Sequence, residues 1–85
     1  MDLRGLVDKS DTHRKILKFF FENPACVDTP RGVATWVRCD RHKAEQVLDE
    51  LAGMGLLIAH KTSSTSGYSL ARSRSVVSAM RKVFA

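Results

Sequence analysis

No acidic residue follows Glu50, so residues 51–85 carry positive charge only. Residues 1–50 hold nine basic and nine acidic side chains, and the net charge of +5 therefore lies entirely in the C-terminal part. One-sided positive charge favours a polyanionic partner, with nucleic acid as the first candidate. A solvated face that only keeps the chain soluble gives the same pattern. The basic residues concerned are Lys61, Arg72, Arg74, Arg81 and Lys82.

Long apolar runs and cysteines are both scarce. No apolar stretch approaches the roughly 18 residues that a membrane-spanning helix needs, and the N-terminus lacks the apolar region of a signal peptide. Only two cysteines are present, with no secretory signal before them. This combination predicts a cytoplasmic protein with no disulfide and no membrane partner.

Motifs for catalysis or cofactor binding are also missing. The three histidines, His13, His42 and His60, fall on separate predicted elements, and no glycine-rich phosphate loop is present. Cys39 and His42 have the spacing of metal ligands, and Cys26 and His60 are further candidates to join them. Cys39, however, is expected to point inward as a small apolar residue, and His42 outward. We therefore predict no enzyme activity, no cofactor and no metal.

Residues 29–57 organise the rest of the chain and are predicted to form two helices joined by a short turn. Thr29 is a good N-cap, and Pro30 suits the first helical position. Asp40 caps the second helix, and Gly55 supplies the left-handed residue that ends it. Apolar residues recur at helical spacing in both: Val33, Ala34 and Val37 in the first, and Ala44, Val47, Leu48 and Leu51 in the second.

The flanking segments are predicted from capping signals and apolar spacing. The helix that precedes residues 29–57 is capped by Ser10 or Asp11 and ends at Asn23-Pro24. The flanking elements, in chain order, are a short helix or arm at 1–9, a helix at 10–22, a brief strand at 26–27, a hairpin with strands at 57–62 and 68–71 around a serine-rich turn at 63–67, and an amphipathic helix at 72–85.

Three consecutive phenylalanines occur in the helix at 10–22. Ile16, Leu17 and Phe20 share one helical face and are expected in the core. Three successive residues span about 200° of a helix, so Phe19 or Phe21 must point away from that core. It then lies either beneath the C-terminal helix or in a second subunit.

The segment VATWVRCDRHKAEQVLDELAGMGLL, residues 33–57, resembles winged helix-turn-helix regulators of the MarR and ArsR kind. It has their apolar-Ala-x-x-apolar helix, short turn, capping residue and L-x-x-x-G-L-L ending. The GYSLA segment at 67–71 is similar to their Y-x-L strand, so the resemblance covers roughly residues 11–71. It implies an α+β winged helix-turn-helix fold: a three-helix core with a β-hairpin wing and a C-terminal helix. Residues 1–85 then form one domain, with an arm at 1–9, the winged-helix core at 10–71 and a terminal helix at 72–85.

The resemblance also implies a small transcriptional regulator that binds double-stranded DNA sequence-specifically. The second helix of the motif would enter the major groove and the basic wing would contact the adjacent backbone. Arginine and lysine can read guanine there, and glutamine can read adenine. Arg38 departs from the family pattern, which has glycine at this position. The candidate DNA-binding residues are Thr29, Arg31, Arg38, Arg41, His42, Lys43, Gln46, His60, Lys61, Ser63, Ser64 and Thr65.

Related regulators pair their subunits through terminal helices, so a homodimer is expected. Packing of the C-terminal helix onto its own chain is the competing interpretation. A winged helix used as a protein-interaction module, or as a subunit of a larger complex, is the alternative function, and exposure of Phe19, Phe21 or Trp36 would favour it. The candidate interface residues are Leu3, Leu6, Phe19, Val76, Met80 and Phe84.

Overall fold

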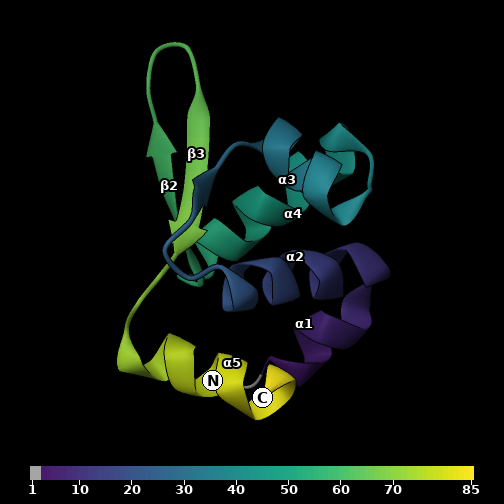
Figure 1. Cartoon of the computed structure of the whole chain (residues 1–85), viewed down its shortest axis with the longest axis vertical. Coiled ribbons are helices and arrows are strands. Elements are labelled where there is room, and N and C mark those ends of the chain that lie inside the picture. The colour runs from purple at the N-terminus through teal and green to yellow at the C-terminus, as the bar shows by residue number, and fades with distance from the viewer. Residues whose placement is uncertain (1–2) are drawn as a thin grey trace.

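The computed structural model describes residues 3–85, so Met1 and Asp2 of the predicted arm lie outside the described residues. The hairpin of β2, β3 and the loop at 62–65, which we call the wing, projects at one end of the molecule, and α5 lies at the opposite end (Figure 1). The elements in chain order are α1 (Arg4–Lys9), α2 (Asp11–Glu22), β1 (Val27–Asp28), α3 (Pro30–Val37), α4 (Arg41–Gly53), β2 (Leu57–Lys61), β3 (Ser66–Leu70) and α5 (Arg74–Phe84).

Side-chain caps open the four longer helices. The side chains of Ser10, Thr29, Asp40 and Ser73 each accept a hydrogen bond from the backbone N–H three residues further on. Each bond satisfies a donor that the first helical turn leaves free. The predicted caps at Ser10, Thr29 and Asp40 are thus confirmed. The terminal helix begins at residue 74, two residues later than predicted, because Ser73 is its cap.

The three strands form an antiparallel sheet in the order β1-β3-β2. Leu57 pairs with Leu70 and Ala59 with Tyr68, which places these residues and Lys61 on the inner face of the sheet. Ile58 and His60 consequently face outward. The second strand of the hairpin begins two residues earlier than predicted and the first ends one residue earlier, since Lys61 pairs with Ser66 and residues 62–65 form the loop. The brief first strand lies at 27–28, one residue later than predicted.

The predicted apolar stripes converge on one core. Ile16, Leu17 and Phe20 of α2 have no exposed surface, and the predicted residues of α3 and α4 are buried with them, except Val37, which is half-buried. Phe21 packs against Phe84 of α5, with ring centroids 5.6 Å apart. The first expectation for the phenylalanine run is therefore confirmed for Phe21. No helix within residues 3–85 combines the length and the apolar character needed to cross a bilayer.

Three of the six candidate dimer contacts are buried within the single chain. Leu3, Val76 and Met80 are only 1–2% exposed within the single chain, where they pack into its own core. A side chain already removed from solvent by its own chain has little surface to give to a second subunit, so this packing favours the competing interpretation, in which the C-terminal helix packs onto its own chain. Leu6, Phe19 and Phe84 are half-buried against the same core.

A polar cluster around the buried side chain of His13 joins α1 and α2 to α4. His13 is 4% exposed, with Nδ1 2.6 Å from Oγ of Ser10 and Nε2 2.9 Å from Oε1 of Glu50. The ammonium group of Lys9 lies 2.6 Å from Oε2 of Glu50. Lys9 first, and then His13, hold the pKa of the Glu50 carboxyl below its usual range. The cluster therefore fixes α4 against the two N-terminal helices.

Candidate nucleic-acid interface

An open groove of about 510 Å³ runs between the N-terminus of α3, the first half of α4 and the wing. It brings together six of the twelve candidate DNA-binding residues from three separate parts of the chain. These six are Thr29, Arg31, Arg41, Ser63, Ser64 and Thr65. Pro30, Glu45, Thr62 and Ser66 also line it and were not among the candidates.

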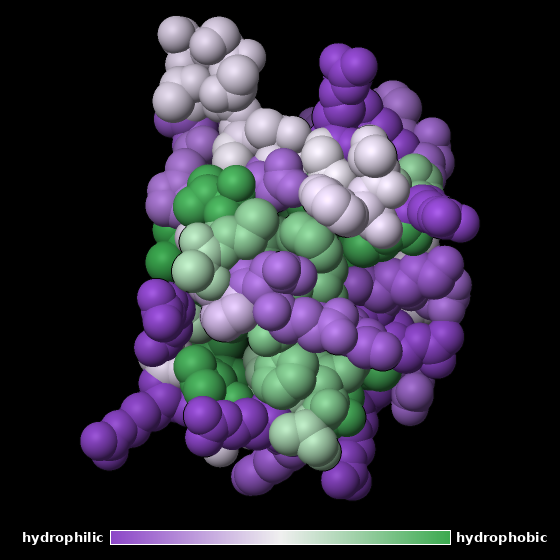
Figure 2. Space-filling view, viewed as in Figure 1, coloured by the Kyte–Doolittle hydropathy of each residue, from purple (hydrophilic) through white to green (hydrophobic). Residues whose placement is uncertain are grey.

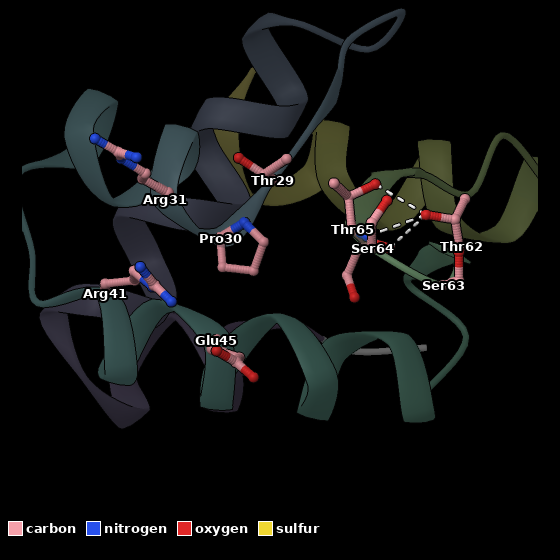
Figure 3. Close-up of a pocket in the computed structure, with 10 residues that line it drawn as sticks. Thr29, Pro30, Arg31, Arg41, Glu45, Thr62, Ser63, Ser64 and Thr65 are labelled. Carbon is pink, nitrogen blue, oxygen red and sulfur yellow. Dashed lines mark hydrogen bonds between the residues drawn. The ribbon is translucent and has the colours of Figure 1, made fainter.

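Two guanidinium groups and a hydroxyl-rich loop lie at opposite ends of the groove (Figure 3). Arg31 and Arg41 occupy one end, the wing loop occupies the other, and Pro30 lies between them. Both arginines are exposed, and neither forms an ion pair with another residue of the described part. Positive charge without an internal partner, next to hydroxyl and backbone donors, is suited to phosphate oxygens.

The loop of the wing is internally hydrogen-bonded. The backbone N–H of Thr62 donates to the carbonyl oxygen of Thr65 over 2.8 Å, and the N–H of Thr65 donates to Oγ1 of Thr62 over 3.0 Å. The tip is pale in Figure 2, neither strongly hydrophilic nor hydrophobic, as expected for serine and threonine. The wing tip is thus uncharged, and the positive charge of the wing lies at Lys61, at the end of β2.

The polar edge of α4 continues away from this groove. His42, Lys43 and Gln46 are all exposed, while Ala44 and Val47 between them are buried. The apolar stripe therefore turns this edge outward, as the sequence predicts. Two carboxylates, Glu45 and Asp49, interrupt the edge further along.

The remaining three candidates, Arg38, His60 and Lys61, lie neither in the groove nor on the polar edge of α4. Arg38 occupies the turn between α3 and α4, with a φ of 58°. His60 is on the outer face of the sheet, with Nε2 2.8 Å from Oγ of Ser69. Lys61 faces α4, with its ammonium nitrogen 3.7 Å from Oδ1 of Asp49.

Asp49 also contacts Tyr68, and no pattern in the sequence predicts this pairing. The phenol of Tyr68 on β3 donates a hydrogen bond to the Asp49 carboxylate on α4. Burial, followed by this hydrogen bond, raises the pKa of Tyr68 well above its usual range. Asp49 thereby holds the wing to α4 through both of its strands.

Most of the C-terminal positive charge lies away from the groove. Arg72, Arg74, Arg81 and Lys82 line a separate hollow of about 680 Å³ on α5. This helix lies at the end of the molecule opposite the wing (Figure 1). The charge excess that first indicated a polyanionic partner is therefore not part of the groove, whose positive charge comes from Arg31 and Arg41.

Histidine, cysteine and acidic side chains do not cluster as a metal site. Within residues 3–85, no three of them come close enough to hold an ion. Burial, reinforced by the negative charge of Asp40, raises the pKa of the Cys39 thiol, which disfavours the thiolate that a metal would need.

Known structures share this architecture, although the sequence itself matches no protein-family model and no curated protein. A homodimeric winged helix-turn-helix DNA-binding domain from Mycobacterium bovis, described as a possible ArsR-family transcriptional regulator, superposes with a TM-score of 0.70 at 19% identity. The match covers 93% of this chain and 69% of that one.

Two further structures agree. HlyU from Vibrio cholerae matches with a TM-score of 0.67 at 18% identity, over 86% of this chain and 75% of its own. A possible transcriptional regulator for arsenical resistance matches with a TM-score of 0.69 at 19% identity, over 99% of this chain and 81% of its own. The chain therefore has the winged helix-turn-helix fold expected from its sequence.

Proposed function

We propose that this chain is a transcriptional regulator that binds double-stranded DNA through the groove and the exposed edge of α4. The observation that carries the proposal is the placement of Arg31 and Arg41 across from the hydroxyl-rich wing, beside an outward-facing helix edge. Residues distant in sequence converge here on one open surface. The DNA-binding domain of similar fold from M. bovis gives independent support.

In this proposal, the groove positions the protein and α4 reads the bases. Arg31 and Arg41, the N-terminus of α3 and the serine hydroxyls of the wing contact phosphates. Lys43, His42 and Gln46 reach the base edges of the major groove, where glutamine pairs with adenine and lysine with guanine. Glu45 lines the same groove, where its carboxylate would repel phosphate, and it can accept a hydrogen bond from cytosine N4 if it reaches a base.

Electrostatic contact of this kind has a measurable signature. Each neutralised phosphate releases counterions, so the logarithm of the binding constant falls with the logarithm of salt concentration by roughly 0.9 per phosphate. Fluorescence anisotropy of labelled random duplex DNA, titrated over a range of salt, measures this slope. Replacing Arg31 and Arg41 with glutamine should reduce its magnitude by about 2.

A matched control separates the groove from net charge. The pair Arg81→Gln and Lys82→Gln removes the same two charges from α5, at the opposite end of the molecule. This pair should leave the slope nearly unchanged. Equal losses in the two double variants would remove the groove from the interface.

Sequence specificity is assigned to α4 and has its own test. Gln46→Ala should weaken discrimination at one base pair of a selected site by about 1–3 kcal/mol, while the phosphate-driven slope stays the same. Duplexes selected from a random pool provide the site. A variant that binds all sequences as the parent does would contradict base reading by Gln46.

We also propose a homodimer that places two α4 helices about one DNA turn apart. The homodimeric M. bovis domain supports this arrangement. Leu6 on α1, Phe19 on α2 and Phe84 on α5 are only half-buried and are its remaining interface candidates. Size-exclusion chromatography with light scattering tests the proposal. A monomer at all concentrations, both free and on DNA, would overturn it.

A further inference from the structure

A second groove, of about 350 Å³, lies between α2 and the end of α3. We call it the Trp36 groove. It shares no residue with the candidate DNA groove. Its charged and aromatic lining residues are Lys15, Lys18, Phe19 and Glu22 on α2, Trp36 on α3, and Arg38 in the turn after α3.

Trp36 is 71% exposed, the most exposed of the large apolar side chains in the described residues. Exposure of Trp36 is the observation that, from the sequence, would favour a protein-interaction surface. Next to it, Phe19 is half-buried and packs edge-on against Phe20, with ring centroids 5.1 Å apart. The groove thus offers one exposed and one half-buried aromatic ring, and tryptophan is among the residues that contribute most to binding at protein interfaces.

The rim of the groove is positively charged. Lys18 and Arg38 form no ion pair with any other residue of the part that the structure describes. Lys15 lies 3.1 Å from the Asp11 carboxylate, so its charge is partly balanced. Glu22 is the one acidic residue among those lining the groove. A ligand with carboxylates near Lys18 and Arg38 therefore meets complementary charge.

The two grooves face different directions. Arg31 and Trp36 are five residues apart on α3, which corresponds to a separation of about 140° around the helix. Arg31 lines the DNA groove and Trp36 lines the groove toward α2. A partner in the Trp36 groove therefore need not displace a partner in the DNA groove.

We propose that the Trp36 groove docks an acidic amphipathic helix of a partner protein. Its apolar stripe would cover Trp36 and Phe19, and its flanking carboxylates would pair with Lys18 and Arg38. An apolar strip flanked by charge is the pattern by which amphipathic helices enter grooves. This inference goes beyond DNA binding and does not depend on it.

Trp36 is the chain's single tryptophan, so its fluorescence reports directly on this groove. The probe is a synthetic amphipathic peptide with leucines at helical spacing, flanked by glutamates. Its binding should shift Trp36 emission to shorter wavelength, because the ring leaves water. The same peptide with lysines in place of the glutamates should bind at least tenfold more weakly.

Paired variants identify the contributing residues. Lys18→Gln with Arg38→Gln should weaken binding of the acidic peptide several-fold, whereas Arg81→Gln with Lys82→Gln, which removes equal charge from α5, should not. Trp36→Ala, followed by anisotropy of a labelled peptide, should lose about tenfold or more. Circular dichroism of each variant checks that the fold is retained.

Four results would overturn the proposal. The first is no emission shift with the acidic peptide, and the second is equal binding of the lysine peptide. The third is an emission shift produced by concentrating the protein alone. The fourth is an emission shift with duplex DNA that the Lys18 and Arg38 changes abolish. The third result would assign the groove to a second copy of this chain, and the fourth to nucleic acid. Because Arg31 and Arg41 are unchanged in these variants, failure here leaves the DNA-binding proposal standing.

Discussion

The ring nitrogen Nε2 of His13 lies 2.9 Å from Oε1 of Glu50, joining α2 to α4 across 37 residues of sequence. An ionised carboxylate only accepts hydrogen bonds, so Nε2 carries the proton and Nδ1 is free to accept from the Ser10 hydroxyl. The second carboxylate oxygen of Glu50 accepts from Lys9. The helix that we propose for base reading is therefore held in place from behind by a polar contact as well as by the core.

Replacing Glu50 tests this contact. Glu50→Ala leaves the buried Nε2–H of His13 without a partner, which should lower the free energy of unfolding by about 1–3 kcal/mol. Glu50→Gln keeps an acceptor for His13 and loses only the exposed pair with Lys9, so its loss should stay below about 1 kcal/mol. Urea denaturation measures both. Glu22→Ala, at an exposed position on α2, is the control and should change stability by under about 0.5 kcal/mol.

The same carboxylate predicts a pH dependence. The pKa of Glu50 is lower in the folded chain than the usual 4.5, so its ionised form stabilises the fold. This contribution is fully present above the unfolded-state pKa and is lost as pH falls through the folded-state pKa. The difference in unfolding free energy between the parent and Glu50→Gln should therefore be constant near neutral pH and shrink below about pH 4.5. A difference that grows on acidification would contradict the assignment.

Gly32 on α3 should resist a change that ordinarily stabilises helices. Glycine to alanine gains about 1 kcal/mol in a helix interior. Here the new Cβ would lie 2.1 Å from Oδ1 of Asp28, which accepts a 2.8 Å hydrogen bond from the backbone N–H of Thr29. Gly32→Ala should therefore destabilise the chain, because the carboxylate has to move and lose that bond.

A double-mutant cycle isolates the Gly32 effect. In an Asp28→Ala background the obstacle is gone, and Gly32→Ala should then stabilise by up to about 1 kcal/mol. Thermal and urea unfolding of the four proteins give the interaction free energy. Additive effects would show that the two positions do not compete for space.

Arg38 adopts a backbone conformation that favours glycine. Its φ of 58° places it in the left-handed region, which is unfavourable for a residue with a Cβ by roughly 1 kcal/mol. Arg38→Gly should raise the free energy of unfolding by up to about 1 kcal/mol, and the β-branched Arg38→Val should lower it by at least as much. Asparagine, which tolerates this conformation, should fall between them. Urea denaturation of the three variants checks the order, and a stabilising valine would contradict it.

Local signals in the sequence predicted the fold well. The caps at Ser10, Thr29 and Asp40 and the apolar spacing of the long helices depend on neighbours within one or two turns, so they can be read without knowing the tertiary structure. The positive φ of Gly55 was predicted from its place after the second helix, whereas the left-handed conformation of Arg38 was not, because arginine stands where the family has glycine. The resemblance to winged helix-turn-helix regulators then supplied the order in which these elements pack.

The site was less predictable because it depends on distances between segments. His13 and Glu50, or Asp49 and Tyr68, have no sequence pattern that pairs them, and only the packed fold brings each pair together. The sequence also could not tell that Arg72 and Arg81 lie on the far side of the molecule from the wing. Thr62 was expected in the first strand and Ser66 in the turn, whereas Thr62 begins the loop and Ser66 begins β3.

The hydrogen bonds between Thr62 and Thr65 have a consequence for any ligand of the wing. A flexible serine loop would lose conformational entropy when it bound a ligand, and this loss would lower the affinity. In this loop the hydrogen bonds between Thr62 and Thr65 restrict the backbone before any ligand binds. For any ligand of the wing, the two threonines would therefore raise the affinity mainly by fixing the conformation of Ser63 and Ser64, rather than through direct contacts with the ligand.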